Sequence, residues 1–302
     1  MRISGFSFAR NAVKLYYPIR EAILSVLPIV DEFVLAWAPG DAGDETRDVV
    51  EAIGDPRIRI VEGRWEEERL GARAYSEMTN LALDECSGDW CLYVQADEVV
   101  HEEDLPLIKA RCQQLLGDRR VEGFLFDYLH FFGDYDHYQP GHGWYRMEIR
   151  IIRNGLDIRS VRDAQSFRHP GQRRLAVAWS GARIFHYGWV RPPRLMQDKD
   201  KEFLAHRRGR TAIEAAYREA PAEMDYGPLG RLPVYRGTHP AVMRERIAEM
   251  DWKDKLREED PPGTRRWQLH KDERRKYRLL SAIERWTGLD LNHKNYGRLI
   301  KV

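Results

Sequence analysis

The sequence predicts an α/β protein in which a mostly parallel sheet is flanked by helices and a helical extension follows at the C-terminus. Apolar stretches of strand length alternate with amphipathic helical stretches through the first hundred residues. Strands that alternate with helices form parallel sheets through right-handed crossovers. Residues 90–94 (WCLYV) are apolar without interruption, which is typical of a strand buried on both faces. Beyond Pro192 the chain becomes charged, with apolar residues at helical spacing.

The first three strands follow from short apolar stretches. Residues 1–8 alternate loosely and end in the polar turn Arg10-Asn11. Pro18 suits a first helical turn, and apolar residues then recur at helical spacing until Pro28. A short apolar strand over 32–37, a helix over 46–53 and an alternating strand over 57–62 come next.

A helix over about 72–86 ends before Gly88 and leads into the strand at 90–94. After Asp97 the strict alternation stops. A helix at about 103–116 precedes strands at 123–132 and 147–153, and a further strand is expected at 182–190. The last helical pattern covers 272–287. A soft domain boundary near Arg191 therefore separates a sheet-forming part from a helical part.

Composition excludes several classes of protein. The chain has 49 Lys and Arg against 48 Asp and Glu, a net charge of +1, so neither a polybasic nucleic-acid binder nor an acidic tail is expected. No stretch approaches the roughly 18 apolar residues of a membrane-spanning helix, and the N-terminus is too short and too polar for a signal peptide. Three cysteines without C-x-x-C spacing favour free thiols in the cytoplasm.

The charge is uneven. Residues 191–302 carry 26 Lys and Arg against 18 Asp and Glu, a net charge of +8. This part also contains Trp252, Trp267 and Trp286. Three interpretations stay open: a solvated helical face, a peripheral contact with the inner face of a membrane, or a contact with another copy of the chain.

Polar residues follow the first, second and fourth predicted strands: Arg10-Asn11, the loop 40–44, and Asp97-Glu98. Ligands of open α/β sheets bind beyond the carboxyl ends of parallel strands. Two carboxylates directly after an apolar strand favour a bound Mg²⁺ or Mn²⁺. The alternative is that these acids cap the following helix.

Four segments carry a family resemblance. They are FARN at 8–11, DEFVLAW at 31–37 with GDET at 43–46, Asn80 with GDW at 88–90, and VQADE at 94–98. In order and spacing they resemble a family 2 glycosyltransferase of the GT-A type, well over residues 1–105 and loosely over 120–200. The resemblance implies a GT-A-like nucleotide-diphospho-sugar transferase fold. It places a nucleotide-sugar half at 1–105, an acceptor half at 106–190 and a mostly helical extension at 191–302.

The resemblance also implies site residues. The metal, Mn²⁺ or Mg²⁺, is expected on Asp97 and His186. The expected nucleotide-sugar contacts are Arg10, Asn11, Trp37, Asp44, Asn80, Gln95, Asp97 and Arg191; Arg194 and Lys199 are further candidates to face the diphosphate. Two positions depart from the family pattern. Gln95 replaces the first Asp of the metal motif, and Trp37 stands where the family has a base-contacting Asp, so Trp37 either stacks on the base or belongs to the core.

The implied activity is metal-dependent transfer of a sugar, with inversion, from a nucleoside-diphosphate-sugar to a saccharide, cell-envelope or lipid-linked acceptor. UDP is the first candidate nucleotide, with GDP and dTDP as alternatives. The acceptor hydroxyl needs a carboxylate base; Asp163 is favoured, then Glu148, with Asp127 and Asp134 as further candidates. The aromatic loop 131–145 is expected to form an acceptor cradle, a lid or an interface.

Two rival functions stay open at this point. A nucleotidyltransferase also uses carboxylates and a metal, but it is expected to have a glycine-rich basic loop after the first strand, and Ser4-Gly5-Phe6 is not one. A catalytically degenerate nucleotide- or sugar-binding protein is the other rival, because Gln95 weakens the metal motif.

Overall fold

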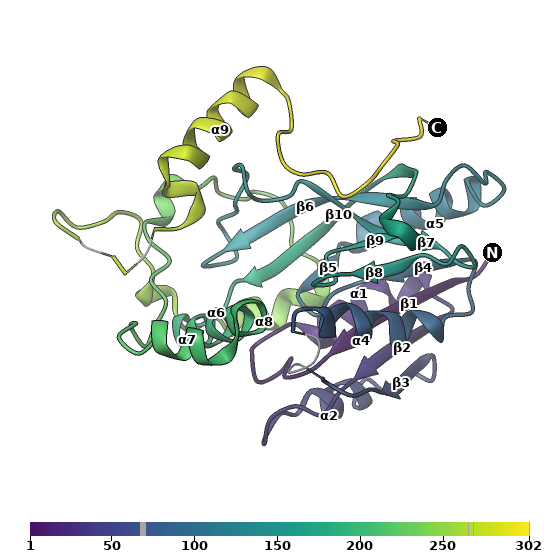
Figure 1. Cartoon of the computed structure of the whole chain (residues 1–302), viewed down its shortest axis with the longest axis horizontal. Coiled ribbons are helices and arrows are strands. Elements are labelled where there is room, and N and C mark those ends of the chain that lie inside the picture. The colour runs from purple at the N-terminus through teal and green to yellow at the C-terminus, as the bar shows by residue number, and fades with distance from the viewer. Residues whose placement is uncertain (67–70, 265, 268, 302) are drawn as a thin grey trace.

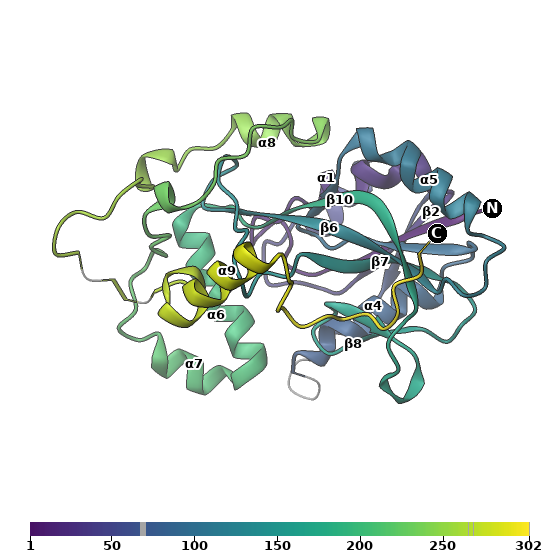
Figure 2. The same ribbon diagram turned by 90° about the horizontal axis from the view of Figure 1, so that it is seen from above.

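The computed structural model describes residues 1–66, 71–264, 266–267 and 269–301. Its centre is a mixed sheet of eight strands in the order β3-β2-β1-β4-β7-β6-β10-β5, with helices packed on both faces (Figures 1 and 2). The sheet strands are β1 (Ile3–Ala9), β2 (Glu32–Trp37), β3 (Ile58–Glu62), β4 (Trp90–Tyr93), β5 (Glu98–Val100), β6 (Gly123–Phe132), β7 (Met147–Arg153) and β10 (Val177–Trp189).

The predicted alternation of strands and helices is confirmed. The crossovers between the first four strands contain α1 (Ile19–Val26), α2 (Thr46–Glu51) and α4 (Arg73–Asp84). β1 pairs in parallel with β2 and β4, and β2 pairs in parallel with β3. β6 and β10 are parallel as well, whereas β4–β7, β6–β7 and β10–β5 are antiparallel. The four strands β3, β2, β1 and β4 are therefore all parallel to one another, and the sheet becomes mixed beyond β4.

Both faces of the sheet are buried, as the apolar strands predict. Phe33 and Leu35 belong to the cluster that contains Ile23 of α1, whereas Val34 and Ala36 belong to the cluster that contains Met78 of α4. Successive side chains of a strand point to opposite faces, so β2 contributes to two hydrophobic layers at once. These layers hold the carboxyl ends of β1 and β4 at one edge.

Three short strands and one turn are not foreseen by the sequence patterns. Glu98 opens β5, which pairs antiparallel with β10, and it therefore does not cap the following helix. The 3₁₀ turn Glu102–Asp104 and α5 (Leu105–Gln114) come after β5. A separate hairpin of β8 (Arg159–Val161) and β9 (Ser166–Arg168) follows β7. Strands of three residues are too short to carry a readable alternation.

The C-terminal part contains helices, joined by long irregular segments. The helices are α6 (Pro193–Arg208), α7 (Arg210–Ala216), α8 (Arg244–Ala248) and α9 (Arg275–Thr287). The same part contains 3₁₀ turns at Leu229–Arg231, Ala241–Met243, Lys253–Lys255 and Lys271–Glu273. Two further 3₁₀ turns lie earlier in the chain, at Leu27–Ile29 and Pro170–Gln172. The tail then returns to the sheet: the Val177 N–H donates to the carbonyl of Arg298 (2.9 Å) and the Ile300 N–H to that of Val177 (2.7 Å). Among the described residues, no helix is long and apolar enough to cross a membrane.

Candidate active site

A cavity of about 900 Å³ opens where β1, β4, β6 and β10 end. Its lining includes residues that follow β1 and β4, the ends of β6 and β10, and residues of α6. The segments before and after α9 also contribute, through Lys271, Arg274, Asn292 and His293. This is the edge at which open α/β sheets bind ligands. The cavity draws residues from both sides of residue 190, and the domain division there stays a prediction.

Six of the residues singled out from the sequence line this cavity: Arg10, Asn11, Gln95, Asp97, Asp163 and His186. They come from four separate stretches of the chain. Asn11 has a positive φ of 54°, and its side-chain oxygen accepts the backbone N–H of Asp41 at 2.7 Å. Asn11 therefore holds the loop after β2 against the turn after β1, which keeps Arg10 at the cavity.

Three other predicted residues are not among the lining residues. The ring of Trp37 is covered by the Arg47 guanidinium, 5.0 Å from its centroid. Asp44 accepts the hydroxyl of Thr46 at 2.7 Å, and Asn80 holds the backbone N–H and carbonyl of Ser160 at 2.8 and 3.1 Å. The nucleotide-sugar contacts expected of these three side chains stay predictions.

Arg191 and Lys199 form a cationic pair, in which Arg191 is buried and Lys199 is half-buried. Arg191 is fully buried, and both side chains donate to the carbonyl of Gly188, at 3.1 and 3.0 Å. Within the described ranges neither forms a salt bridge with a carboxylate. Burial, and then the charge of Arg191, lower the pKa of Lys199 to about 7. Arg191 also donates to the carbonyl of Leu15 at 2.7 Å. Two neighbouring cations that no carboxylate pairs favour the binding of an anion, and Lys199 lines the cavity.

The two adjacent carboxylates after β4 separate into different roles. Glu98 is fully buried and accepts both Nε and Nη2 of Arg150 at 2.7 Å, together with the Tyr128 hydroxyl at 2.7 Å. Asp97 instead lines the cavity. Burial raises the pKa of Asp97, but the charges of His186, Lys199 and Arg191 outweigh burial and hold that pKa well below its ordinary value. Asp97 is therefore the carboxylate available to a ligand.

His130, on β6, forms a hydrogen bond with His186, on β10. Burial, and then the charge of His186, lower the pKa of His130 well below its ordinary value, so His130 is neutral. Its Nε2 donates to the carbonyl of Tyr145 at 2.7 Å, which leaves Nδ1 as an acceptor. This Nδ1 lies 3.0 Å from Nδ1 of His186. Nδ1 of His186 therefore donates to His130, and Nε2 is the nitrogen of His186 that faces Asp97.

Asp97 and His186 form a cradle that fits a divalent cation. Oδ2 of Asp97 lies 3.5 Å from Nε2 of His186, a separation that a shared proton or a shared cation can bridge. A Cβ on Gly188 would lie 2.5 Å from that oxygen and 2.7 Å from that nitrogen, so glycine keeps the space open. The described residues contain no group of three or more potential protein ligands. Mg²⁺ and Mn²⁺ commonly take one or two protein ligands and complete their shell with phosphate and water.

The two candidate bases differ in access. Asp163 lies in the turn of the β8–β9 hairpin and lines the cavity. Glu148 is buried and does not line it; its Oε1 accepts the amides of Gln165 and Asn295, and burial raises its pKa. Gln95 donates to the carbonyl of Ala164 at 3.3 Å. Gln95 therefore ties the metal-motif turn to the hairpin turn that carries Asp163.

The remaining acidic candidates lie elsewhere. Asp127 accepts the indole N–H of Trp179 at 3.1 Å. Asp134 is buried and accepts the His137 backbone N–H at 2.7 Å. Neither is among the residues that line the cavity.

Two groups of aromatic side chains line the cavity. The sequence predicted only one member of the second group, Trp144, as part of the loop 131–145. Tyr75 contacts both Phe8 and Trp65 edge to face. Arg10 lies beside them, with its guanidinium 5.4 Å from the Trp65 ring centroid. At the other end, Trp144 of the loop 131–145 packs on Trp189, with ring centroids 5.5 Å apart. The first group and His130 were missed, because each looks like ordinary core in the sequence and only the strand register brings them together.

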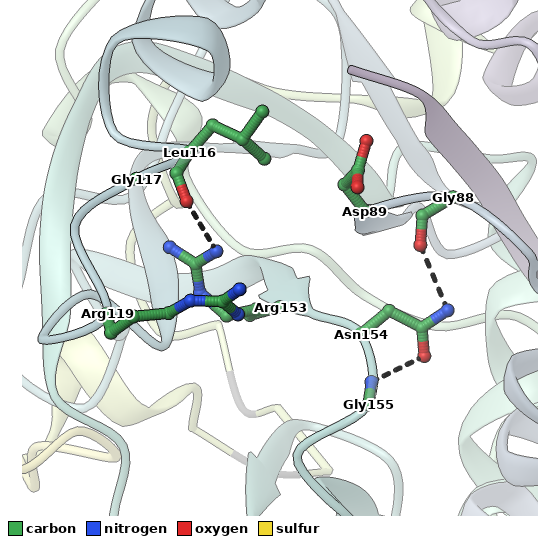
Figure 3. A pocket seen from close by; sticks show the side chains of 8 residues that line it. All are labelled: Gly88, Asp89, Leu116, Gly117, Arg119, Arg153, Asn154 and Gly155. Carbon is green, nitrogen blue, oxygen red and sulfur yellow. Dashed lines mark hydrogen bonds between the residues drawn. The ribbon is translucent and has the colours of Figure 1, made fainter.

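A second cavity, of about 600 Å³, lies near the start of β4 and the end of β7 (Figure 3). Its buried cation is Arg153, which donates to the carbonyls of Leu115, Leu116, Asp118 and Val121. The guanidinium also lies 4.1 Å from the Trp90 ring centroid. Because these carbonyls satisfy Arg153, this cavity gives no reason to expect a ligand.

No protein-family model and no curated protein matches the chain. Among solved structures, it is similar to glucosyl-3-phosphoglycerate synthase from Mycobacterium tuberculosis in complex with Mn²⁺, UDP and phosphoglyceric acid, with a TM-score of 0.30 and 21% identity over 43% of this chain and 43% of that chain. The same enzyme in complex with Mg²⁺ and UDP gives a TM-score of 0.29 and 20% identity, over 43% of each chain. S. aureus TarS 1–349 in complex with UDP gives a TM-score of 0.39 and 14% identity, over 68% of this chain and 65% of that chain. The chain spans less than two thirds of the length of each, so the function has to come from the residues of the site.

Proposed function

We propose that the chain is a metal-dependent glycosyltransferase with a GT-A-like fold, which moves a sugar from a nucleoside-diphosphate-sugar to a saccharide or lipid-linked acceptor. One observation carries the proposal. A single cavity combines an open carboxylate–imidazole cradle, Asp97 with His186, and the half-buried Lys199, behind which lies the buried Arg191. Such a site suits a divalent cation with a diphosphate, because the phosphate oxygens would complete the metal shell and compensate the buried charge.

In this proposal the donor lies across the carboxyl ends of β1 and β4. The nucleobase would stack among Phe8, Tyr75 and Trp65, with Arg10 beside them. The diphosphate would lie between Asp97 and Lys199. UDP is the first candidate nucleotide, with GDP and dTDP as alternatives. Residues 1–190 would form the catalytic unit, with segments of residues 191–302 completing the acceptor side of the cavity.

The chemistry follows from these positions. A bound Mn²⁺ or Mg²⁺ supplies Lewis-acid stabilisation of the leaving diphosphate, and Asp97 and His186 would hold it. Lys199 would add a positive charge toward the same oxygens, because a bound diphosphate favours its ammonium form. The acceptor hydroxyl attacks the anomeric carbon while the bond to the diphosphate breaks, through an oxocarbenium-like transition state. Asp163 would take the hydroxyl proton, and a single displacement would invert the anomeric centre.

The acceptor would enter from the side that carries Trp144 and Trp189. Sugar rings stack their C–H faces on aromatic rings, and both indoles line the cavity. This favours the cradle interpretation of the loop 131–145.

A binding protein without catalysis is the alternative to test. Gln95 replaces a carboxylate of the expected metal motif, but its amide supports the turn that carries Asp163. That contact favours a working site in which one metal ligand has been exchanged for a positioning group.

The proposal is tested by a thermal-shift series with UDP, GDP, dTDP and CMP, each with and without Mn²⁺, on the wild type and on Asp97→Asn. A ligand at about 100 times its Kd adds roughly 2.7 kcal/mol to the free energy of unfolding. We expect one diphosphate to stabilise the wild type only with Mn²⁺ and to lose this effect in Asp97→Asn. No shift with any nucleotide would overturn the donor site. A shift without turnover of any nucleotide-sugar, hydrolysis included, would favour the binding protein.

A further inference from the structure

Helix α9 has an apolar stripe on its outward surface. Leu279, Ile283 and Trp286 are 63%, 37% and 88% exposed, and their spacing places them on one side of the helix. Leu289 and Leu291, just beyond the helix, are also exposed, at 60% and 43%. Figure 1 shows α9 at the outer edge of the molecule, away from the main sheet.

The opposite side of α9 is fixed to the protein. The backbone N–H of His142 donates to the Ser281 hydroxyl at 2.8 Å. Glu284 is buried and accepts His142 and Arg146, at 3.0 and 3.2 Å. These contacts prevent a small rotation of the helix from burying the stripe in the core.

The stripe is bordered by cations on both sides. Lys276 lies along one edge of it and Arg278 and Arg285 along the other, and all three are exposed. Across the described residues, none of the three forms a salt bridge with a carboxylate. The only acid of α9 is Glu284, which points inward. A tryptophan and leucines between unpaired cations is the pattern of a helix that lies in the interface of an anionic bilayer.

We propose that α9 is a docking helix for an anionic membrane surface, lying in the plane of the interface with Trp286 and Leu279 inserted. Charge favours this occupant over a second copy of the chain. A two-fold contact through the same stripe would place Lys276, Arg278 and Arg285 against their own copies. With 13 residues, the helix is about 20 Å long, and it lies on the bilayer rather than across it.

The position of α9 also relates membrane docking to the cavity. Lys271 and Arg274 just before the hydrophobic stripe, and Asn292 and His293 after it, line the cavity. A bilayer against α9 would therefore lie beside the acceptor side of the cavity. This placement of the bilayer favours an acceptor that a lipid holds at the membrane, an inference that rests on the proposed function.

The experiment is flotation of the full chain with vesicles of pure phosphatidylcholine or with about one third phosphatidylglycerol. We expect flotation with the anionic vesicles only, and its loss at about 0.5 M NaCl because salt screens the attraction. The variant Leu279→Ser with Trp286→Ser should bind at least about tenfold more weakly. Trp179→Ser removes an indole that is 50% exposed on β10 and should bind like the wild type.

A charge variant makes the test independent of the apolar side chains. Arg278→Glu with Arg285→Glu should also lower binding at least about tenfold, since each cation contributes roughly fivefold at an anionic surface. Failure of the wild type to float with anionic vesicles, or equal losses in Trp179→Ser, would overturn the proposal. A dimer in sedimentation velocity that Trp286→Ser abolishes would assign the stripe to a second copy. The UDP thermal shift on the same samples reports separately on the proposed function.

Discussion

Nδ1 of His130 lies 3.0 Å from Nδ1 of His186, on directly paired positions of the parallel strands β6 and β10. The other nitrogen of His130 is occupied by the carbonyl of Tyr145. The pair therefore determines which nitrogen of His186 faces Asp97. A histidine that ligates a metal commonly has its second nitrogen held by a hydrogen bond. In the proposed metal site, the His130 imidazole would do this for His186.

The first prediction concerns the hydrogen bond between His130 and His186. His130→Leu removes the acceptor of the His186 Nδ1–H, so the proton is free to move to Nε2 and block the cradle. We expect the Kd for Mn²⁺, measured by electron paramagnetic resonance of free Mn²⁺ in the presence of UDP, to rise about tenfold or more.

His130→Asn should recover much of that Mn²⁺ affinity, because its amide oxygen can accept the same N–H. His101→Phe is the matched control, since His101 is buried and bonds Thr238 away from the cavity. Equal Mn²⁺ affinity in His130→Leu and the wild type would show that the hydrogen bond from His186 to His130 does not orient His186.

Gly188 gives the second prediction. In Gly188→Ala the new Cβ would collide with Oδ2 of Asp97 and Nε2 of His186, so the space for the cation closes. We expect the Mn²⁺-dependent thermal shift with UDP to disappear while the protein still unfolds cooperatively. Gly117→Ala is the control, because a Cβ there meets no atom within 4 Å. A preserved Mn²⁺ effect in Gly188→Ala would place the metal elsewhere.

The third prediction separates the two candidate bases. Asp163→Asn should lower kcat by about 10² to 10⁴ with little change in the affinity for UDP, since a general base acts on the acceptor proton. Glu148→Gln should have a much smaller effect on kcat, because Glu148 is buried behind Gln165 and Asn295. Steady-state kinetics with the donor found by thermal shift decides between them, and the reverse order of effects would make Glu148 the base.

The sequence predicted the parts of the fold that local patterns encode. The strands at 123–132 and 147–153 have the same bounds in the structure, because long apolar alternation is a strong signal. The β8–β9 hairpin and β5 were missed because three residues carry no period. The return of the tail to β10 could not be foreseen, since nothing in the sequence of residues 288–300 identifies its partner.

The site was predicted in part for the same reason. Asp97 was singled out from its place directly after a strand and His186 from the family resemblance, and both line one cavity. Glu98 looked equivalent to Asp97, but β5 turns its side chain toward Arg150. His130 was missed because its role depends on being directly opposite His186, and that register belongs to the assembled sheet.

The fourth prediction concerns the buried pair of Glu98 and Arg150, both fully buried. Glu98→Gln leaves the Arg150 charge uncompensated and should lower the free energy of unfolding by about 3–5 kcal/mol. Glu98→Leu with Arg150→Met should cost less than Glu98→Gln alone, because no unpaired charge remains. Glu51→Gln, in an exposed pair with Arg47, should cost less than about 1 kcal/mol. Urea denaturation measures all three, and a cost for Glu98→Gln as small as for Glu51→Gln would contradict the argument.

The fifth prediction uses Lys199, whose pKa is lowered to about 7 by burial and by Arg191. A bound diphosphate favours the charged ammonium, so it raises this pKa, and binding takes up a proton when the free lysine is neutral. The affinity for UDP with Mg²⁺ should therefore fall as the pH rises from 7.5 to 9, by up to about tenfold per pH unit. Lys199→Arg keeps its charge over this range and should flatten the profile, whereas Lys199→Met should bind weakly at every pH. Isothermal titration calorimetry in two buffers of different ionisation enthalpy detects the proton uptake directly. A Lys199→Arg profile as steep as that of the wild type would mean that another group titrates at the diphosphate.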